Sequence, residues 1–359
     1  MSTTRNRGSL PTSALDCHLS NAIWRRSRVV PTATISPNSV LIRSLSPDDI
    51  VVYIPNHIIV YRDGRDEKLV DCDTTPAGVD PSSGVQSKGV VILPDAPLSA
   101  RLYIPKPQNH LVKKLPLLFF YYGGGFICGT AAEPNMHNFL NLIVAESNAM
   151  IVSVDYRTVP DNHIPTAYDN SWEAIKWAAQ HVDGNGPESW LNEYADLGHV
   201  FFVGDSSGAN IAHQMAIRAG SENMGGSINL EGIILLHPFF WGTTSVGSED
   251  LDPAFIEYME MIWTFDYPET CGLDDPFLNP AMDPKLLNLG GSKEFIYVAE
   301  LDNLRNRGWY YKYILDQSGC KGKINVIEDK GVRHVYFLSD PSLESARAMR
   351  TNISTFINT

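Results

Sequence analysis

The chain has 359 residues, of which 43% are hydrophobic and 19% charged, and its formal net charge at pH 7 is −13. This length suffices for one large domain or two small ones with a sizeable core, and the composition is ordinary for a globular protein. The negative charge argues against nucleic acid or an anionic membrane as a partner, and no apolar run approaches the roughly 18 residues of a membrane span. Five widely spaced cysteines without a CxxC pair indicate neither a disulfide framework nor a zinc site, and they fit a reducing compartment.

Residues 1–46 differ in charge from the rest of the chain. They hold six arginines, no lysine and one acidic residue, Asp16, among many serines and threonines. This composition predicts a transit peptide and a plastid location. An equally good interpretation is a disordered or lid-forming arm of a cytoplasmic protein. The charge changes abruptly after this segment, since the other 313 residues carry 22 basic and 40 acidic side chains.

The remaining residues, 47–359, have the pattern of an α/β domain. From residue 50 to 105 the sequence is strand-like, with turns at Asp63-Gly64 and Asp95-Ala96-Pro97, which predicts antiparallel strands leading into a larger sheet. After it, six short continuous apolar runs alternate with helical stretches. These runs are residues 117–122, 151–154, 200–203, 233–236, 295–299 and 324–327. The alternation predicts a mostly parallel central sheet with helices on both faces.

The stretch from about 243 to 280 breaks this alternation and carries aromatic and aliphatic side chains at mixed helical spacing. It follows the carboxyl end of a predicted strand, which is where open α/β sheets bind their ligands. We therefore expect it to form a helical cap over the site, together with residues from about 47 to 75. A plain core helix would have the same apolar stripe.

Ser206 lies at the tip of a predicted strand-turn-helix junction. An apolar strand precedes it, a helical stretch follows from Ala209, and Gly204 and Gly208 stand two residues before and after it. This G-x-S-x-G spacing suits a serine in a strained turn, because small residues let the strand and the helix approach each other. The same turn places the N–H of Ser207 at a helix N-terminus, where an oxyanion could form. A serine that merely caps the helix would show the same five residues.

A serine hydroxyl needs a base within hydrogen-bond reach and an acid that orients the base. Among the histidines after Ser206, His213 lies two turns along the helix and His237 closes a core strand. His334 instead sits in a glycine-bearing loop after the last predicted strand, where its imidazole could reach the serine. Asp302 follows the preceding strand and is the predicted acid, with Glu300 as its close rival.

Three consecutive glycines, Gly123 to Gly125, follow another predicted core strand. Such a run is costly to order, and it exposes backbone N–H groups that no side chain obstructs. It therefore predicts an oxyanion-binding loop. A phosphate-binding loop is the alternative, but the lysine and threonine of that pattern are absent here.

From about residue 50 to the C-terminus the chain resembles the plant carboxylesterases of the hormone-sensitive-lipase-like α/β-hydrolases. Five motifs carry the resemblance, and they occur in the order of the family. They are Tyr122-Gly123-Gly124-Gly125-Phe126, Ser153-Val154-Asp155-Tyr156-Arg157, Gly204-Asp205-Ser206-Ser207-Gly208-Ala209-Asn210, Ala299-Glu300-Leu301-Asp302 and Gly331-Val332-Arg333-His334-Val335.

The resemblance implies an α/β-hydrolase fold and a serine carboxylesterase that cleaves a small, largely apolar ester through an acyl-enzyme. Ser206 would be the nucleophile, His334 the base and Asp302 the acid that orients it. No metal or organic cofactor is implied. The backbone N–H groups of the oxyanion hole would belong to Gly123, Gly124 and Ser207. Four aromatic side chains are expected to contact the substrate: Tyr122, Phe126, Trp241 and Trp263.

Two other functions stay open for this sequence. Enzymes of the same family use the triad for intramolecular transfer, lyase or cyclase reactions in specialised metabolism. The gibberellin receptor of this family has lost the histidine and only binds its ligand, so the presence of His334 argues against a receptor. Tyr122 departs from the family, which usually has histidine there, and a looser glycine loop would weaken turnover of generic esters.

Overall fold

The structure is a computed structural model that describes residues 49–70, 73–106, 114–247, 249, 252–319 and 322–359. The chain divides into two units, Met1–Pro47 and Asp48–Thr359, and all the described residues belong to the second. The transit peptide or arm predicted over residues 1–46 lies outside the described residues.

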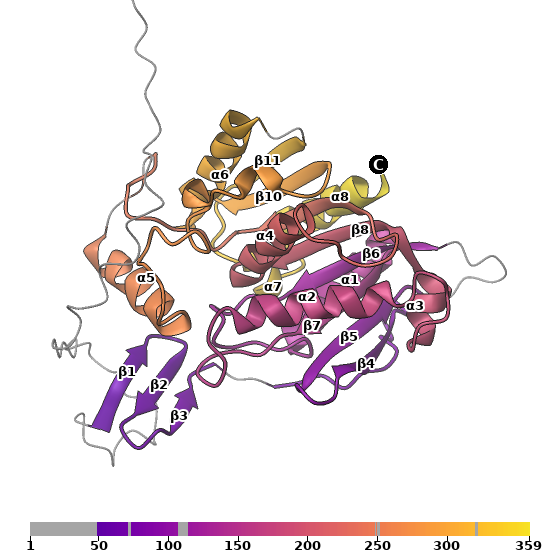
Figure 1. The fold of residues 1–359 in the computed structure, drawn as a ribbon, viewed down its shortest axis with the longest axis horizontal. Coiled ribbons are helices and arrows are strands. Elements are labelled where there is room, and N and C mark those ends of the chain that lie inside the picture. The colour runs from indigo at the N-terminus through magenta and orange to yellow at the C-terminus, as the bar shows by residue number, and fades with distance from the viewer. Residues whose placement is uncertain (1–48, 71–72, 107–113, 248, 250–251, 320–321) are drawn as a thin grey trace, which may run out of the picture. The chain divides into compact units, whose positions relative to one another are not determined.

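An eight-stranded sheet forms the centre of this unit, and its strands are ordered β11-β10-β9-β8-β6-β7-β5-β4 (Figure 1). All neighbouring strands pair in parallel except at β5, which is antiparallel to both β4 and β7. The mostly parallel sheet predicted from the apolar runs is thereby confirmed. Its strands are β4 (Gln86–Leu93), β5 (Leu98–Ile104), β6 (Leu115–Tyr121), β7 (Met150–Asp155), β8 (Ala195–Asp205), β9 (Leu230–Leu236), β10 (Lys293–Ala299) and β11 (Lys323–Asp329).

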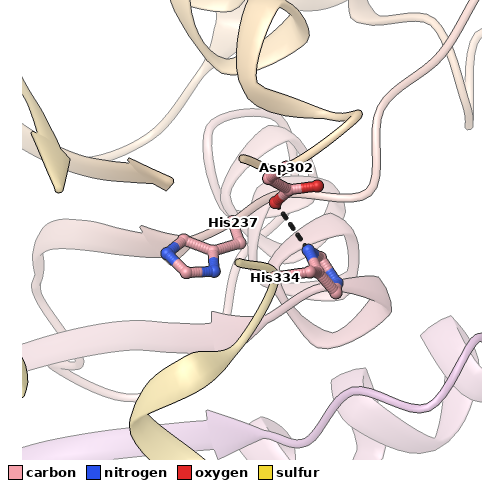
Figure 2. Close-up of side chains that lie close together, drawn as sticks. All are labelled: His237, Asp302 and His334. Carbon is pink, nitrogen blue, oxygen red and sulfur yellow. Dashed lines mark hydrogen bonds and ion pairs between the residues drawn. The ribbon is translucent and has the colours of Figure 1, made fainter. Parts of the chain in front are cut away.

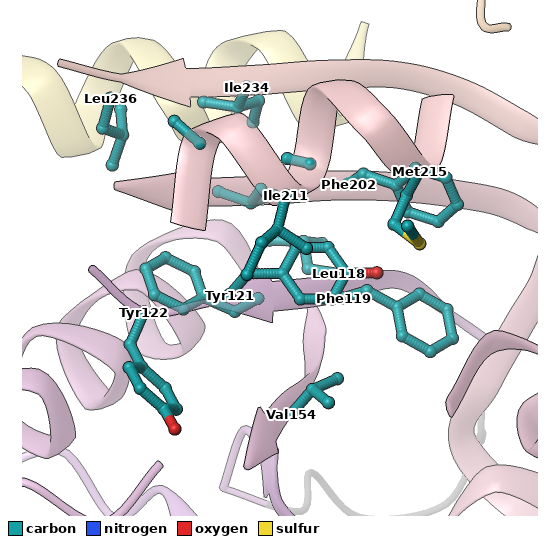
Figure 3. Packing of buried hydrophobic residues seen from close by; sticks show 14 of the residues in the cluster. Leu118, Phe119, Tyr121, Tyr122, Val154, Phe202, Ile211, Met215, Ile234 and Leu236 are labelled. Carbon is teal, nitrogen blue, oxygen red and sulfur yellow. The ribbon is translucent and has the colours of Figure 1, made fainter. Parts of the chain in front are cut away.

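Helices cover the two faces of this sheet because successive strand side chains point to opposite sides. On β6, Phe119 meets Phe202 of β8 on the side of α4 (Figure 3). Phe120 of the same strand meets Phe139 of α1. Each central strand is therefore apolar on both faces, which explains its continuous hydrophobic run. The helices are α1 (Pro134–Ser147), α2 (Thr166–Ala179), α3 (Ser189–Tyr194), α4 (Ser207–Ala219), α5 (Pro253–Asp266), α6 (Arg305–Ser318), α7 (Tyr336–Ser339) and α8 (Glu344–Asn358), with 3-10 turns at Pro280–Met282 and Leu286–Asn288.

A second, three-stranded antiparallel sheet precedes the large one and consists of β1 (Ile50–Ile54), β2 (Ile58–Tyr61) and β3 (Asp66–Lys68). The predicted turn at Asp63-Gly64 joins β2 to β3, where Gly64 takes the left-handed φ of +86° that the turn requires. The strands expected between residues 50 and 105 are thus divided between two sheets, and only β4 and β5 enter the large one.

Helix α5 lies in the segment predicted as an insertion between core strands, since it falls between β9 and β10. Its buried side chains, Met259, Ile262, Trp263 and Asp266, recur at helical spacing along one face. The helix contacts β1 of the small sheet.

No helix among the described residues is long and apolar enough to cross a membrane.

Candidate active site

Ser206 occupies the sharp turn between β8 and α4, as its glycine spacing predicts. Its backbone is left-handed, with φ of 52° and ψ of −120°, which is strained for a residue other than glycine. A Cβ on Gly204 would collide with the carbonyl of Gly208, and one on Gly208 would collide with the carbonyl of Tyr121. The N–H of Ser206 donates to Leu236 O at 2.9 Å and so ties the turn to β9.

His334 and Asp302 meet Ser206 at the carboxyl edge of the sheet. His334 Nε2 lies 2.9 Å from Ser206 Oγ, and its Nδ1 lies 2.6 Å from Asp302 Oδ2 (Figure 2). Burial acts to raise the pKa of Asp302, but the hydrogen bond and charge of His334 outweigh it and hold that pKa below its usual value. An ionised Asp302 accepts the Nδ1 proton, which leaves the Nε2 lone pair directed at the serine hydroxyl.

Glu300, the rival acid, has other partners. Its carboxylate accepts the Gly331 N–H at 2.9 Å and lies 3.2 Å from Lys330 Nζ on the surface. Asp302 is held instead by the N–H of Leu304, which donates to its Oδ1 at 2.9 Å. The geometry therefore pairs His334 with Asp302 and excludes Glu300 from this contact.

The glycine loop lies directly against the serine turn. The N–H of Gly123 donates to Asp205 Oδ1 at 3.1 Å, so the carboxylate beside Ser206 already occupies one of the two glycine donors expected in the oxyanion hole. Gly124 and Gly125 have φ of +114° and +62°. Within the described part of the chain, no hydrogen-bond acceptor is assigned to the N–H groups of Gly124, Gly125 or Ser207.

Tyr122 fastens the start of this loop to the strand beside it. Its hydroxyl donates to Tyr156 O at 3.1 Å, the Tyr156 hydroxyl donates back to Tyr122 O at 2.6 Å, and the two rings stack with centroids 4.4 Å apart. Burial, reinforced by Tyr156 and Asp155, raises the pKa of Tyr122 well above its ordinary value, so the phenol stays a hydrogen-bond donor. These contacts fix the backbone directly before Gly123.

The other three aromatic residues expected at the substrate are buried among protein side chains. Phe126 packs edge-on against Tyr168 and Phe239. Trp241 lies under the guanidinium of Arg307. Trp263 Nε1 donates to Thr270 Oγ1 at 2.7 Å. Contact of these residues and Tyr122 with a substrate stays a prediction.

Two residues lie over the glycine loop: Ile262, from the stretch expected to form the cap, and His57, which the sequence did not single out. A Cβ built on Gly125 would stand 2.9 Å from Ile262 Cδ1 of α5 and 3.2 Å from His57 Nε2, which comes from the turn between β1 and β2. His57 also lies beside Tyr258 of α5, with ring centroids 6.2 Å apart. These contacts join chain segments some 200 residues apart, and no local pattern in the sequence signals them.

A third histidine, His237, lies close to His334 and Asp302 (Figure 2), and three such side chains can hold a metal ion. Here, however, Nδ1 of His237 accepts the Val335 N–H at 2.8 Å, and Nδ1 of His334 is bonded to Asp302. Because these ligand atoms are already committed to hydrogen bonds, the donor set fits proton transfer better than metal binding. His213, in contrast, points into the core, where its Nδ1 bonds the Tyr311 hydroxyl at 2.9 Å.

Comparison with known proteins finds a matching family model, related sequences and a similar solved structure. A family model for the alpha/beta hydrolase fold matches residues 118–338. Probable carboxylesterase 13 of Arabidopsis thaliana is 42% identical over 313 residues, which cover 84% of this chain and 95% of that protein. Tuliposide A-converting enzyme 1, chloroplastic, of Tulipa gesneriana is 36% identical over 91% of this chain and 82% of its own. The solved structure of an esterase from Pyrobaculum calidifontis matches with a TM-score of 0.60 and 25% identity, over 78% of this chain and 85% of that one.

Proposed function

Because this chain belongs to the alpha/beta hydrolase fold family, we propose that it hydrolyses a small, largely apolar carboxylic ester through an acyl-enzyme on Ser206. The observation that carries the proposal is the continuous hydrogen-bonded chain from Ser206 through His334 to Asp302. A serine activated by an oriented imidazole is the arrangement that acyl transfer requires. The apolar side chain of Ile262, which lies against Gly125 of the glycine loop, supports an apolar substrate.

In the proposed reaction, His334 Nε2 takes the proton of Ser206 Oγ while the oxygen bonds to the ester carbonyl carbon. His334 then returns the proton to the alcohol oxygen as its bond to that carbon breaks. Water attacks the resulting acyl-enzyme, gives one proton to His334 and releases the acid as Ser206 regains its proton. Asp302 stabilises the imidazolium at each stage.

The developing oxyanion needs N–H donors that have no other acceptor. We assign this role to Gly124, Gly125 and Ser207, in place of the set that included Gly123, because the Gly123 N–H donates to Asp205. Ser207 begins the 13-residue helix α4, so the helix dipole adds to the stabilisation. We also propose that α5 and the β1–β3 sheet form the cap over this loop, since Ile262 and His57 both lie against Gly125.

Ser206→Ala tests the proposal with p-nitrophenyl acetate and butyrate as substrates. We expect turnover to fall at least about 1,000-fold with an unchanged circular dichroism spectrum, because a triad acts as a unit. Ser171→Ala is the matched control, since Ser171 is a buried serine inside α2 whose hydroxyl bonds Ala167 O. Unchanged turnover in Ser206→Ala would remove the nucleophile assignment.

The same protein separates the two alternatives. Hydrolysis in ¹⁸O-labelled water places one labelled oxygen in the acid product, whereas an intramolecular transfer or cyclisation on the same triad gives an unlabelled product. Binding of a small molecule without turnover of any ester would favour a receptor. One relative is named for converting tuliposide A, so cleavage of simple esters alone does not identify the natural reaction, and the labelled product does.

We further propose that residues 1–46 direct the chain to the plastid. Their arginine-rich composition and the word chloroplastic in the name of the tulip relative support this location. Fusing these residues to a fluorescent protein tests it, and diffuse cytoplasmic fluorescence would contradict it.

A further inference from the structure

His237 is a buried histidine at the carboxyl end of β9, directly before Pro238. Its ring lies 5.7 Å from that of His334, between centroids (Figure 2). It also contacts the rings of Tyr336 and Phe337. In the sequence it looks like the last residue of a core strand. Its backbone is left-handed, however, with φ of +50°, so the chain turns sharply at this position.

The hydrogen bond of His237 reaches the residue next to His334. Its Nδ1 accepts the N–H of Val335 at 2.8 Å. Val335 has φ of +44° and ψ of 32°, a left-handed conformation that is unfavourable for a β-branched residue. Strain of this kind persists only where surrounding contacts hold it. The acceptor on His237 is one such contact, and it joins two strained residues from distant parts of the chain.

This acceptor stays neutral in the folded protein. Burial, helped by the neighbouring His334, lowers the pKa of His237 to about 3. A protonated imidazole could not accept the Val335 N–H and would place a second positive charge beside the imidazolium that forms during catalysis. With Nδ1 as the acceptor, the proton of His237 resides on Nε2, which points away from the triad and has no partner among the described residues.

The loop of His334 is therefore held from two sides. Leu301 N donates to Val332 O at 3.0 Å on the side of Asp302, and His237 binds Val335 on the other. The Asp302 hydrogen bond orients the imidazole ring but does not fix the backbone that carries it. Loss of the His237 contact would allow the backbone to relax out of the left-handed turn and to move Nε2 away from Ser206.

We propose that His237 is a positioning residue for catalysis, which fixes the backbone at Val335 so that His334 stays within reach of both Ser206 and Asp302. The inference rests on the proposed esterase function. It assigns His237 no contact with the substrate, so its effect should fall on kcat and leave KM nearly unchanged. A displacement of about 1 Å in a catalytic group can cost on the order of 100-fold in rate.

The test compares three variants of His237 with p-nitrophenyl butyrate as the substrate. His237→Leu removes the acceptor at similar volume, and we expect kcat to fall about 100-fold with KM within about twofold of wild type. His237→Asn keeps an acceptor oxygen near the position of Nδ1 and tolerates a left-handed backbone, so kcat should stay within about fivefold. His237→Gln moves its acceptor one bond further out and should resemble His237→Leu.

His213→Leu is the matched control. His213 is also fully buried, burial also lowers its pKa to about 3, and its Nδ1 also has one hydrogen-bond partner, but it faces the core of α4 and α6. Its loss should lower the melting temperature without a selective loss of kcat. A second readout is the proton NMR signal of His334 Nδ1–H, which should broaden in His237→Leu and stay sharp in His237→Asn.

Three outcomes would overturn the inference: wild-type kcat in His237→Leu, equal losses in the Leu and Asn variants, or a loss confined to KM. The nucleophile assignment of the proposed function has its own test, since it fails if Ser206→Ala retains turnover. A folded His237→Leu with full activity alongside an inactive Ser206→Ala would leave the esterase proposal intact and reject the role of His237.

Discussion

Asp205 places an ionisable group one residue before the nucleophile, in a fully buried position. Its Oδ1 accepts the Gly123 N–H, so it connects the serine turn to the glycine loop. Burial raises the pKa of Asp205 to about 7, although the charge of His334 and the N–H of Gly123 act in the opposite direction. The same carboxylate therefore organises the site and disfavours folding when it is charged.

This raised pKa has a definite sign for stability. The unfolded chain releases the proton near the ordinary value of 3.8, whereas the folded protein keeps it until about pH 7. Between these values the native state binds more protons, so its stability falls as pH rises through the window and stays lower above it. The difference between the pKa values of 3.8 and about 7 limits the change in the free energy of unfolding to about 4 kcal/mol.

Asp205→Asn should therefore raise the melting temperature by a few degrees at pH 8 and change it little at pH 4. Asp302→Asn is the matched comparison with the opposite sign. Its folded pKa is lowered, so Asp302 contributes stability above its unfolded pKa that is lost as pH falls through the folded one. Thermal melts of both variants at pH 8 and pH 4 measure the effect of Asp205, and a further melt below pH 3.8 is needed for that of Asp302. A lower melting temperature for Asp205→Asn at pH 8 would contradict the burial argument.

At the scale of elements, the glycine loop is where three parts of the chain meet. It follows β6, it lies against the serine turn after β8, and α5 with the β1–β2 turn lies over Gly125. Gly125 combines a left-handed φ with contacts to Ile262 and His57 that leave no room for a side chain. The backbone N–H that it presents thus depends on the fit of α5 and the β1–β2 turn as well as on the loop.

Gly125→Ala should lower kcat about 100-fold, since a displaced oxyanion donor costs that much or more. Gly64→Ala controls for backbone strain, because Gly64 is also left-handed but has no atom within 4 Å of its missing side chain, and it should cost stability without loss of kcat. Adding Ile262→Ala to Gly125→Ala removes one collision and should restore part of the rate. Wild-type kcat for Gly125→Ala would exclude this residue from the oxyanion hole.

The sequence predicts those features that local chemistry determines. The apolar runs locate the six later strands of the large sheet, because strands buried on both faces must be continuously hydrophobic. The spacing of Gly204, Ser206 and Gly208 locates the turn, because its close backbone contacts exclude larger residues. Asp302 and His334 follow neighbouring strands, so the topology of the sheet brings them together.

Other features depend on tertiary contacts that no short pattern records. The separate β1–β3 sheet and the position of His57 follow from how that sheet packs against α5. The acceptor of the Gly123 N–H is Asp205, which is 82 residues away in sequence. His237 reads as an ordinary strand end until the left-handed turns at His237 and Val335 bring it next to the base.

At the scale of the whole molecule, the three triad residues follow strands that differ in how many neighbouring strands they have and in how deeply they are buried. Ser206 follows β8, which has β6 and β9 as neighbours, and Asp302 follows β10, which lies between β9 and β11. His334 follows β11, which pairs only with β10 among the described strands and which has no fully buried residue. The nucleophile therefore stands on the best-packed part of the sheet and the base on its margin.

Heating should therefore abolish the activity at a lower temperature than the one at which the protein unfolds. Strands at a sheet margin open at lower free energy than the centre, so β11 and the loop of His334 should detach while the rest of the sheet is intact. We expect initial rates to decline below the midpoint seen by circular dichroism and to recover fully on cooling, with amide hydrogens of β11 exchanging ahead of those of β8. If activity is lost at the same temperature as the global fold, β11 is as stable as the central strands. If one outer strand sets the upper temperature limit of activity, mutations that strengthen the pairing of β10 with β11 should raise that limit.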